Sequence, residues 1–183
     1  MVKKLKSVAV YCGHQFGTDP QFAQDAYAVG EMLAKNCIRM IFGGGDVGLM
    51  GTVANGALEH GGVVKGVSTD DVIALQEPAH DGVDMQVVDG VNERKQIMFE
   101  LSDAFIILPG GIGTLNELSD IMTMQQIGET NKPLFFLNTN HFWDPLGELV
   151  KHMMDNGFVV KTDNYHLYIA NTVTELTEQI LNY

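Results

Sequence analysis

The segment FIILPGGIGTLNE, residues 105–117, joins an uncharged run of strand length to a glycine-rich turn and a helical pattern. Residues 104–108 carry no charge, as in a strand of a parallel sheet whose two faces are both buried. Pro109 has no N–H and ends the strand. Apolar residues recur at helical spacing from Thr114 to about Ile127. The sequence therefore predicts a strand, a turn and a helix in immediate succession.

The turn in this segment has the features of an anion site. Gly110, Gly111 and Gly113 leave the backbone open to a close ligand and free to adopt positive φ. The first N–H groups of the following helix have no intrahelical acceptor and lie at the positive end of the helix dipole. We therefore predict that this turn cradles a phosphate group.

Glu117 lies one helical turn after the glycines and has two interpretations. Thr114-x-x-Glu117 fits a capping box, in which the Glu117 side chain would bond the N–H of the capping residue. Alternatively, Glu117 is a catalytic carboxylate close to the bound phosphate. Because Gln also serves in a capping box, a Glu117→Gln variant should fold in either case and lose turnover only in the second.

Length, charge and cysteine content limit the class of protein. The 183 residues are enough for one domain with a substantial core, and we expect residues 1–183 to form it. The net charge of −12 argues against DNA or RNA as a partner, since these polymers require a basic face. A small phosphorylated ligand needs only a few local cations. Cys12 and Cys37 are too few for a disulfide scaffold, and we expect both to be buried in a reduced protein.

The sequence also predicts a setting for the protein. No apolar run approaches the ~20 residues of a membrane span. The N-terminal lysines are followed by too few apolar residues for a signal peptide. We therefore expect a cytoplasmic protein with no membrane partner. The six histidines have no metal-ligand spacing, so we expect neither a metal nor another cofactor.

Strand-like and helix-like segments alternate along the chain. Strands are predicted at residues 7–11, 38–42, 63–67, 85–88, 104–108, 134–137 and 167–170. One helix is predicted to start at residue 20, and a second follows the strand at 38–42 and ends at about residue 60. Further helices are predicted over 92–101, 114–127, 146–154 and from 172 onward. This alternation predicts an α/β fold in which helices cover both faces of a parallel sheet.

In such sheets ligands bind beyond the carboxyl ends of the strands, so the loops after residues 11, 42, 67 and 108 should form one rim with the site. Residues 68–84 show no clear periodicity and are interpreted as a long loop over that site.

A second glycine turn, GGGDVGLMG at residues 43–51, follows the predicted second strand. It matches the spacing G-x-G-x-x-G of dinucleotide sites, but that pattern belongs to the first strand–helix turn. One interpretation is close packing of a helix on a strand through glycines. The interpretation we favour is that Gly44 and Gly45, together with the turn at 109–114, enclose one mononucleotide.

Arg94 and Lys95 are candidate ligands for an anion. If Asn92 caps the next helix, both cations lie in its first turn, where the dipole disfavours positive charge by about 0.3–1 kcal/mol each. Local rules are often broken at functional sites, so the two side chains are expected to face an anion or polar substrate. The alternative is that both are solvated surface residues. Met98 is a candidate lining for a base pocket, although most methionines here are expected in the core.

Three segments together resemble the LOG ("Lonely Guy") family of cytokinin riboside 5′-monophosphate phosphoribohydrolases: residues 43–51, Glu93-Arg94-Lys95, and PGGIGTLNE at 109–117. The resemblance covers about residues 7–160, and PGGxGTxxE is specific to this family and its near relatives. It implies a Rossmann-like three-layer α/β sandwich and a homodimer whose site is partly shared at the interface.

The same resemblance implies hydrolysis of the N-glycosidic bond of a nucleoside 5′-monophosphate, AMP or a cytokinin ribotide, to free base and ribose 5-phosphate. It makes Arg94 and Glu117 catalytic, places the phosphate on residues 110–114, and makes Glu77 a substrate contact. Many members of the family carry the label "lysine decarboxylase", but nothing in the sequence resembles a pyridoxal-phosphate lysine site.

The chain departs from the family pattern at four places. Ile112 replaces a usual Tyr, Asn92 a usual His and Met124 a usual Trp, and the segment 14–16 replaces a Ser-rich turn. We expect these positions to affect which base is accepted. They also leave open a second function, that of a nucleotide-binding or sensor protein without turnover.

Overall fold

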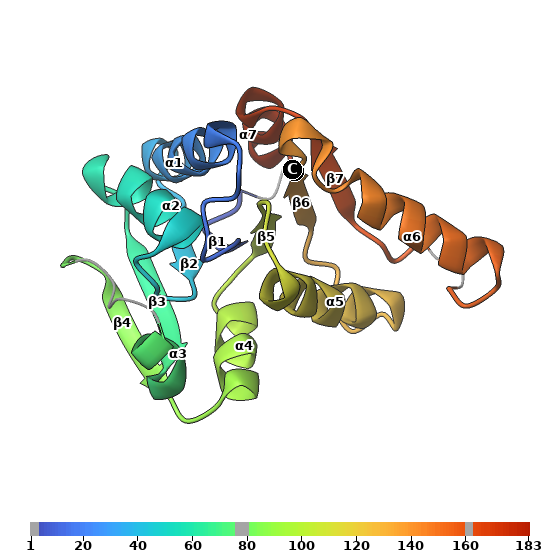
Figure 1. Ribbon diagram of the computed structural model, residues 1–183, viewed down its shortest axis with the longest axis horizontal. Helices are drawn as coiled ribbons and strands as arrows, with labels where there is room; N and C mark the ends of the chain where they lie inside the picture. The colour runs from blue at the N-terminus through green and yellow to red at the C-terminus, as the bar shows by residue number, and fades with distance from the viewer. Residues whose placement is uncertain (1–3, 76–80, 160–162) are drawn as a thin grey trace.

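A computed structural model gives the fold of residues 4–75, 81–159 and 163–183 (Figure 1). The strands are β1 Ser7–Tyr11, β2 Arg39–Phe42, β3 Val64–Thr69, β4 Asp84–Val88, β5 Ala104–Ile107, β6 Leu134–Leu137 and β7 Leu167–Ala170. The helices are α1 Pro20–Lys35, α2 Gly48–Glu59, α3 Asp70–Leu75, α4 Val91–Glu100, α5 Ile112–Gln126, α6 Asp144–Asp155 and α7 Val173–Leu181, with a short 3₁₀ helix, η1 Thr139–His141.

The seven strands form one parallel sheet in the order β4-β3-β2-β1-β5-β6-β7. From β1 the chain runs outward through β2 and β3 to β4, and then returns to the other side of β1 as β5. The direction of winding therefore reverses between β1 and β5. In open parallel sheets such a reversal leaves a crevice at the carboxyl ends of the two strands, where ligands bind. The predicted α/β fold with a parallel sheet is confirmed.

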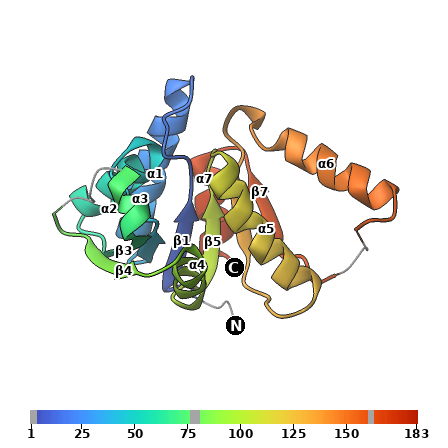
Figure 2. The same cartoon turned by 60° about the horizontal axis from the view of Figure 1, so that its bottom comes forward.

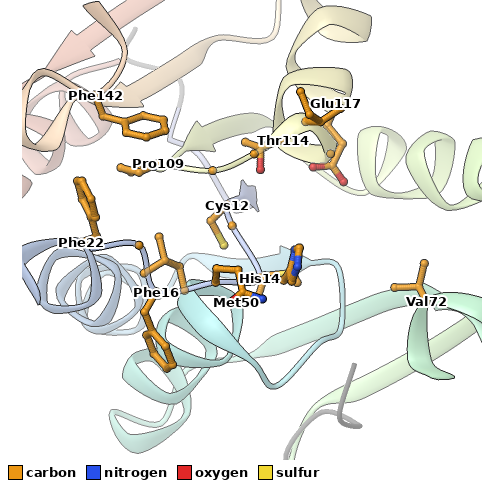
Figure 3. A pocket seen from close by; sticks show the side chains of 18 of the residues that line it. Cys12, His14, Phe16, Phe22, Met50, Val72, Pro109, Thr114, Glu117 and Phe142 are labelled. Carbon is orange, nitrogen blue, oxygen red and sulfur yellow. The ribbon is translucent and has the colours of Figure 1, made fainter. Parts of the chain in front are cut away.

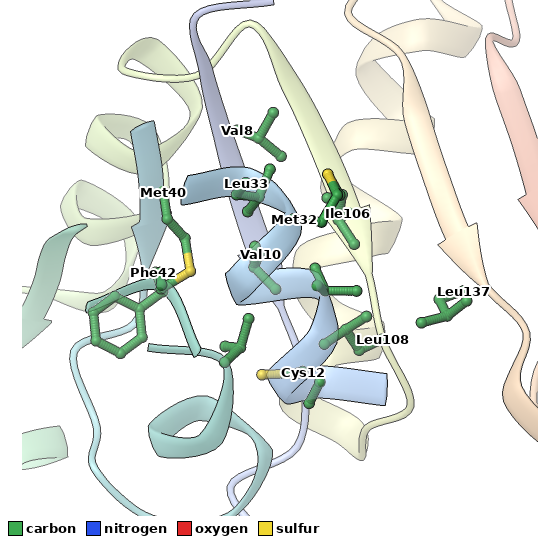
Figure 4. Packing of buried hydrophobic residues seen from close by; sticks show 14 of the residues in the cluster. Val8, Val10, Cys12, Met32, Leu33, Met40, Phe42, Ile106, Leu108 and Leu137 are labelled. Carbon is green, nitrogen blue, oxygen red and sulfur yellow. The ribbon is translucent and has the colours of Figure 1, made fainter. Parts of the chain in front are cut away.

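Each face of the sheet has its own core, because successive side chains of a strand point to opposite faces. On one face Val8 and Val10 of β1 pack with α1 (Figure 4), in a cluster that also includes residues of α2 and α7. On the other face Ala9 and Tyr11 pack with α4 and α5, which lie together on that side (Figure 2). All residues of β5 are buried, which explains why this stretch of sequence carries no charge.

The interpretation of residues 68–84 as one long loop is wrong. Strand β3 continues to Thr69, and α3 follows it without a gap. The Thr69 hydroxyl accepts a hydrogen bond from the Val72 N–H at 3.3 Å, and Asp70 and Asp71 lie in the first turn, where the helix dipole favours acidic residues. These local signals, rather than apolar periodicity, start the helix.

The structure also corrects the start of α4 and the position of Cys37. Gly90, not Asn92, is the N-cap of α4, and the Arg94 N–H bonds its carbonyl at 2.9 Å. Cys12 is buried as expected, but Cys37 is exposed. Its φ of 56° places it in the left-handed turn that follows α1, where the side chain faces solvent.

No helix within the described ranges is long and apolar enough to cross a membrane.

Candidate active site

The turn after β5 is fastened to the turn after β1. The Gly13 N–H donates to Pro109 O at 3.0 Å, and the Leu49 N–H of α2 donates to Gly13 O at 3.2 Å. A Cβ atom at Gly110 would lie 2.2 Å from Thr114 Oγ1 and 2.9 Å from the backbone nitrogen of Gly13. Glycine at position 110 therefore lets the two turns meet at the point where the sheet winding reverses.

The N-terminus of α5 presents backbone donors at this point. Gly111 is the N-cap, and no side chain of the described chain caps the helix. The first bond back to the cap runs from the Leu115 N–H to Gly111 O at 3.0 Å, so the N–H groups of Ile112, Gly113 and Thr114 precede the helical ladder. Cβ atoms added at Gly111 and Gly113 would meet no atom within 4 Å. The turn thus combines accessible backbone with the positive end of a helix dipole.

The capping box considered for Thr114 and Glu117 is not formed. Because α5 begins at Ile112, Thr114 lies inside the helix rather than at its cap. The carboxylate of Glu117 instead accepts a hydrogen bond from Arg94, a residue of α4. Glu117 is therefore free of any capping role.

A cavity of about 360 Å³ opens beside the turn, at the carboxyl ends of β1 and β5 (Figure 3). Its lining includes Thr114 and the neighbouring glycines, and Glu117 lies toward one end while Phe22 and Phe142 lie toward the other. The two phenylalanine rings meet edge to face, with centroids 5.9 Å apart. One end of the cavity is therefore charged and the other is apolar and aromatic.

Arg94 and Glu117 form a partly buried ion pair at the charged end. Arg94 Nη1 lies 3.2 Å from Glu117 Oε1, and each side chain is 12% exposed. Arg94 Nε also donates to Val67 O within β3, at 2.9 Å. A Cβ atom at Gly43 would lie 2.2 Å from Arg94 Nη2, so the glycine turn after β2 makes room for the guanidinium. Strand β3, the turn after β2 and the helix that follows β5 thus contribute to the placement of this pair.

The pKa of Glu117 is raised to about 7, chiefly because burial disfavours the carboxylate. The positive charges of Arg94 and then Lys95 oppose this rise, while Asp120 adds to it. A carboxyl group with a pKa near neutrality populates both protonation states under ordinary conditions, which suits acid–base chemistry.

Comparison with known proteins shows the family to which the chain belongs. The family model described as "Possible lysine decarboxylase" matches residues 50–180. A cytokinin riboside 5′-monophosphate phosphoribohydrolase of Rhodococcoides fascians is 38% identical over 92% of this chain and 85% of its own length. The enzyme of the same name, LOG, from Oryza sativa subsp. japonica is 32% identical over 98% of this chain and 74% of its own. The chain belongs to the LOG family.

Solved structures show that the LOG chain has a common Rossmann-like fold. A molybdenum cofactor carrier protein of Chlamydomonas reinhardtii superposes with a TM-score of 0.72 at 21% identity, covering 97% of this chain and 96% of that one. A molybdenum cofactor binding protein of Rippkaea orientalis superposes with a TM-score of 0.69 at 23% identity, covering 98% and 97%. At this identity the likeness concerns the fold alone.

Six of the residues predicted from the LOG motifs come together in the cavity. Its lining includes both residues of the ion pair and the glycine turn, namely Arg94, Glu117, Gly110, Gly111, Gly113 and Thr114. Arg94 reaches the cavity from α4, and the other five residues belong to α5 and to the turn that precedes it. Their meeting depends on the parallel pairing of β1 with β2 and β5.

Four other predicted residues lie elsewhere. Gly44 and Gly45 are buried and are not among the residues that line the cavity, and a Cβ at Gly44 would meet the Met85 side chain at 2.6 Å. Met98 is fully buried among core residues, so it presents no surface to a base. Lys95 points to the other side of Glu117, where it pairs with Asp120.

The predicted substrate contact Glu77 lies outside the described residues.

The LOG motifs do not include the residues that line the apolar end of the cavity, so the sequence did not predict them. Phe22 of α1 packs against the core and also lines the cavity. Val72 lines it from α3, a helix that the sequence pattern did not predict. Phe142 follows η1, in which Asn140 and His141 both have positive φ, and no short sequence signal marks this conformation. In the described part of the chain no group of three or more His, Cys, Asp or Glu side chains is arranged to hold a metal ion.

Proposed function

We propose that this protein hydrolyses the N-glycosidic bond of a nucleoside 5′-monophosphate and releases the free base and ribose 5-phosphate. The observation that carries the proposal is the Arg94–Glu117 pair, which lines the same cavity as the uncapped N-terminus of α5. An anion site and a carboxylate of near-neutral pKa therefore lie within one ligand's reach. Relatives at 30–38% identity that bear this activity in their names support the proposal.

The phosphate of the substrate binds the N–H groups of Ile112, Gly113 and Thr114. Those donors and the helix dipole hold the dianion without a cationic side chain in direct contact. Anchoring at the phosphate provides binding energy that fixes the ribose relative to Glu117, so that the reaction does not wait for a chance encounter. The sugar then extends from the middle of the cavity toward its charged end.

Bond cleavage follows the pattern of glycoside hydrolysis. As the bond between C1′ and the base nitrogen breaks, positive charge develops on the ribose, and the ionised carboxylate of Glu117 stabilises it. Water attacks C1′ and Glu117 takes the proton that the water loses, while the departing base takes up a proton from solvent at its nitrogen. Glu117 then releases its proton to solvent, which restores the carboxylate. Arg94 holds the carboxylate in place before the substrate binds, and it orients the ribose or the departing base afterwards.

A decarboxylase function has no support from the cavity. Decarboxylation of an amino acid by pyridoxal phosphate requires a lysine that forms a Schiff base with the cofactor. Among the described residues, the lining of the cavity includes Arg94 but no lysine. Lys95, the lysine next to it in sequence, is held on the other side of Glu117.

We further propose AMP or a cytokinin ribotide as the substrate and a cytoplasmic homodimer as the active form. Apolar side chains exposed around α4, α5 and α6, namely Val91, Ile127, Leu149 and Met153, support an association between copies. Light scattering at several protein concentrations tests the dimer. A mass that stays at one chain would contradict it.

The activity is tested by incubating the protein with AMP, N6-isopentenyl-AMP, GMP and CMP, followed by chromatography for free base and ribose 5-phosphate. The matching unphosphorylated nucleosides serve as controls and should not react, because they lack the anchor. Thermal stabilisation by a monophosphate without any release of base would contradict hydrolysis and favour the alternative of a nucleotide-binding or sensor protein.

A further inference from the structure

Glu117 lines two cavities. Besides the substrate cavity, a groove of about 400 Å³ lies along α4 and α5, and Glu117 is the residue that the described linings of both have in common. Arg94 lines the first cavity, whereas Lys95 and Asp120 line the groove. The two cations next to Glu117 in space therefore belong to different cavities.

Lys95 donates to two acceptors of α5 in the groove. Its Nζ donates to Asn116 Oδ1 at 3.0 Å and to Asp120 Oδ2 at 2.6 Å. The side chain of Lys95 is 18% exposed, and that of Asp120 is 47% exposed. Asn116 precedes Glu117 by one residue and Asp120 follows it by three, so the ammonium group spans the turn of helix that carries Glu117. Two of the three N–H donors of the ammonium group are therefore used on α5, and Lys95 is not among the described residues that line the substrate cavity.

The other groups that face Glu117 make its surroundings sensitive to this charge. Tyr11, at the end of β1, lines the groove together with Glu117, and the next residue, Cys12, lines the substrate cavity together with it. Burial raises the pKa of both side chains, and the Glu117 carboxylate adds to the rise. Both therefore stay neutral near pH 7 and screen little. The charges that act on the carboxylate are thus those of Arg94, Lys95 and Asp120. Arg94 and Lys95 lower the pKa of Glu117 and Asp120 raises it, because water screens charges weakly in partly buried surroundings.

We propose that Lys95 is a positioning residue, which acts through Glu117 from the groove and, balanced by Asp120, sets the pH range in which the carboxylate is ionised. Its effect on turnover rests on the role proposed above for Glu117. Its effect on ionisation does not. A lysine that bound the phosphate directly would instead contribute to substrate affinity at every pH.

The test uses Lys95→Met and Asp120→Asn, with Lys95→Arg as the variant that keeps the charge. The carboxyl ¹³C signals of Glu117 are titrated by NMR, and Glu117→Gln assigns them. Removing the cation should raise the pKa of Glu117, and removing the acidic neighbour should lower it, each by about half to one unit. Lys95→Arg should stay close to the unaltered protein.

A pH profile of kcat/KM forms the second arm of the test. Its acidic limb should move to higher pH in Lys95→Met and to lower pH in Asp120→Asn, and raising the pH should restore the activity of Lys95→Met. Limbs that coincide in all variants, or a KM raised equally at every pH by Lys95→Met, would overturn the inference. If the NMR shifts appear but no variant and no parent protein releases base, the inference stands and the proposed function fails.

Discussion

Glu117 of α5 and Arg94 of α4 face each other across the carboxyl ends of the central strands, with Oε1 and Nη1 3.2 Å apart. Neither residue neighbours the other in sequence, and each is positioned by a different glycine turn. Gly110 allows the close turn that starts α5, and Gly43 leaves space for the guanidinium. The geometry of the pair therefore depends on the absence of a side chain at these two glycines.

Replacing Glu117 by Gln should abolish most turnover and preserve the fold. The amide keeps the shape of the side chain but neither stabilises positive charge as a carboxylate does nor takes a proton from water, so kcat should fall by about 10²–10⁴-fold. Base release and thermal unfolding are measured together. Glu148→Gln, on an exposed position of α6, is the matched control and should keep full activity. Equal turnover in both variants would remove Glu117 from the mechanism.

Alanine at Gly110 and alanine at Gly113 should have opposite consequences for stability. At Gly110 the added methyl would meet Thr114 Oγ1 and the Gly13 backbone, so the variant should lose about 1–3 kcal/mol of unfolding free energy. At Gly113 the methyl meets nothing, and alanine inside a helix should add up to about 1 kcal/mol.

The same Gly113→Ala variant should bind a monophosphate less well, because its methyl occupies space beside the phosphate site. We expect kcat/KM to fall by about 10- to 100-fold while the unfolding temperature is maintained. Chemical denaturation and steady-state kinetics check the two effects separately. A Gly113→Ala enzyme with unaltered KM would show that the phosphate binds elsewhere.

Alanine at Gly43 should impair activity through Arg94. Its methyl would overlap Arg94 Nη2, the end of a flexible side chain, so the guanidinium should move while the sheet stays intact. A displacement of this size should lower kcat/KM by about 10²-fold. Gly147→Ala in α6, where an added methyl meets nothing, is the control. Kinetics of the two variants are compared, and similar values would mean that the position of Arg94 does not matter.

The raised pKa of Glu117 predicts two pH effects of known sign. Because the carboxylate is the active form, kcat/KM should fall as the pH drops below about 7. The unfolded chain releases this proton at its ordinary pKa of 4.5 and the folded protein near 7, so between these values the folded state holds more protons. Unfolding free energy should therefore decrease as the pH rises from 4.5 to 7.

Glu117→Gln isolates that contribution to stability. The unfolding free energy of this variant should lack this part of the pH dependence. As the pH rises from 4.5 to 7, the unaltered protein should therefore lose stability relative to the variant. Urea denaturation at several pH values measures it. A difference that stays constant from pH 4.5 to 7 would contradict the raised pKa.

Much of the fold could be predicted because buried parallel strands leave a simple signal. Strands at 7–11, 134–137 and 167–170 have the predicted bounds, and the others differ by one or two residues at their ends. The glycine turn at 109–114 was also found, since a proline and three glycines between a strand and a helix serve few other purposes. In both cases the sequence signal is local.

The side on which each candidate residue faces could not be predicted in the same way. Arg94 and Lys95 are consecutive in α4, and successive residues of a helix point about 100° apart, so both do not reach one anion. The motif at 43–51 resembles a phosphate loop, but its glycines make room for Arg94 and Met85 instead. Such contacts depend on how helices rotate against the sheet, which a single sequence does not encode locally.

The most direct test of the account is a crystal structure of the Glu117→Gln variant with a nucleoside 5′-monophosphate, since this substitution should leave binding intact and stop hydrolysis. We predict phosphate oxygens within hydrogen-bond distance of the N–H groups of Ile112, Gly113 and Thr114, with C1′ of the ribose next to the amide of residue 117. A phosphate bound elsewhere, or a ribose turned toward Phe22 and Phe142 with C1′ away from residue 117, would contradict it.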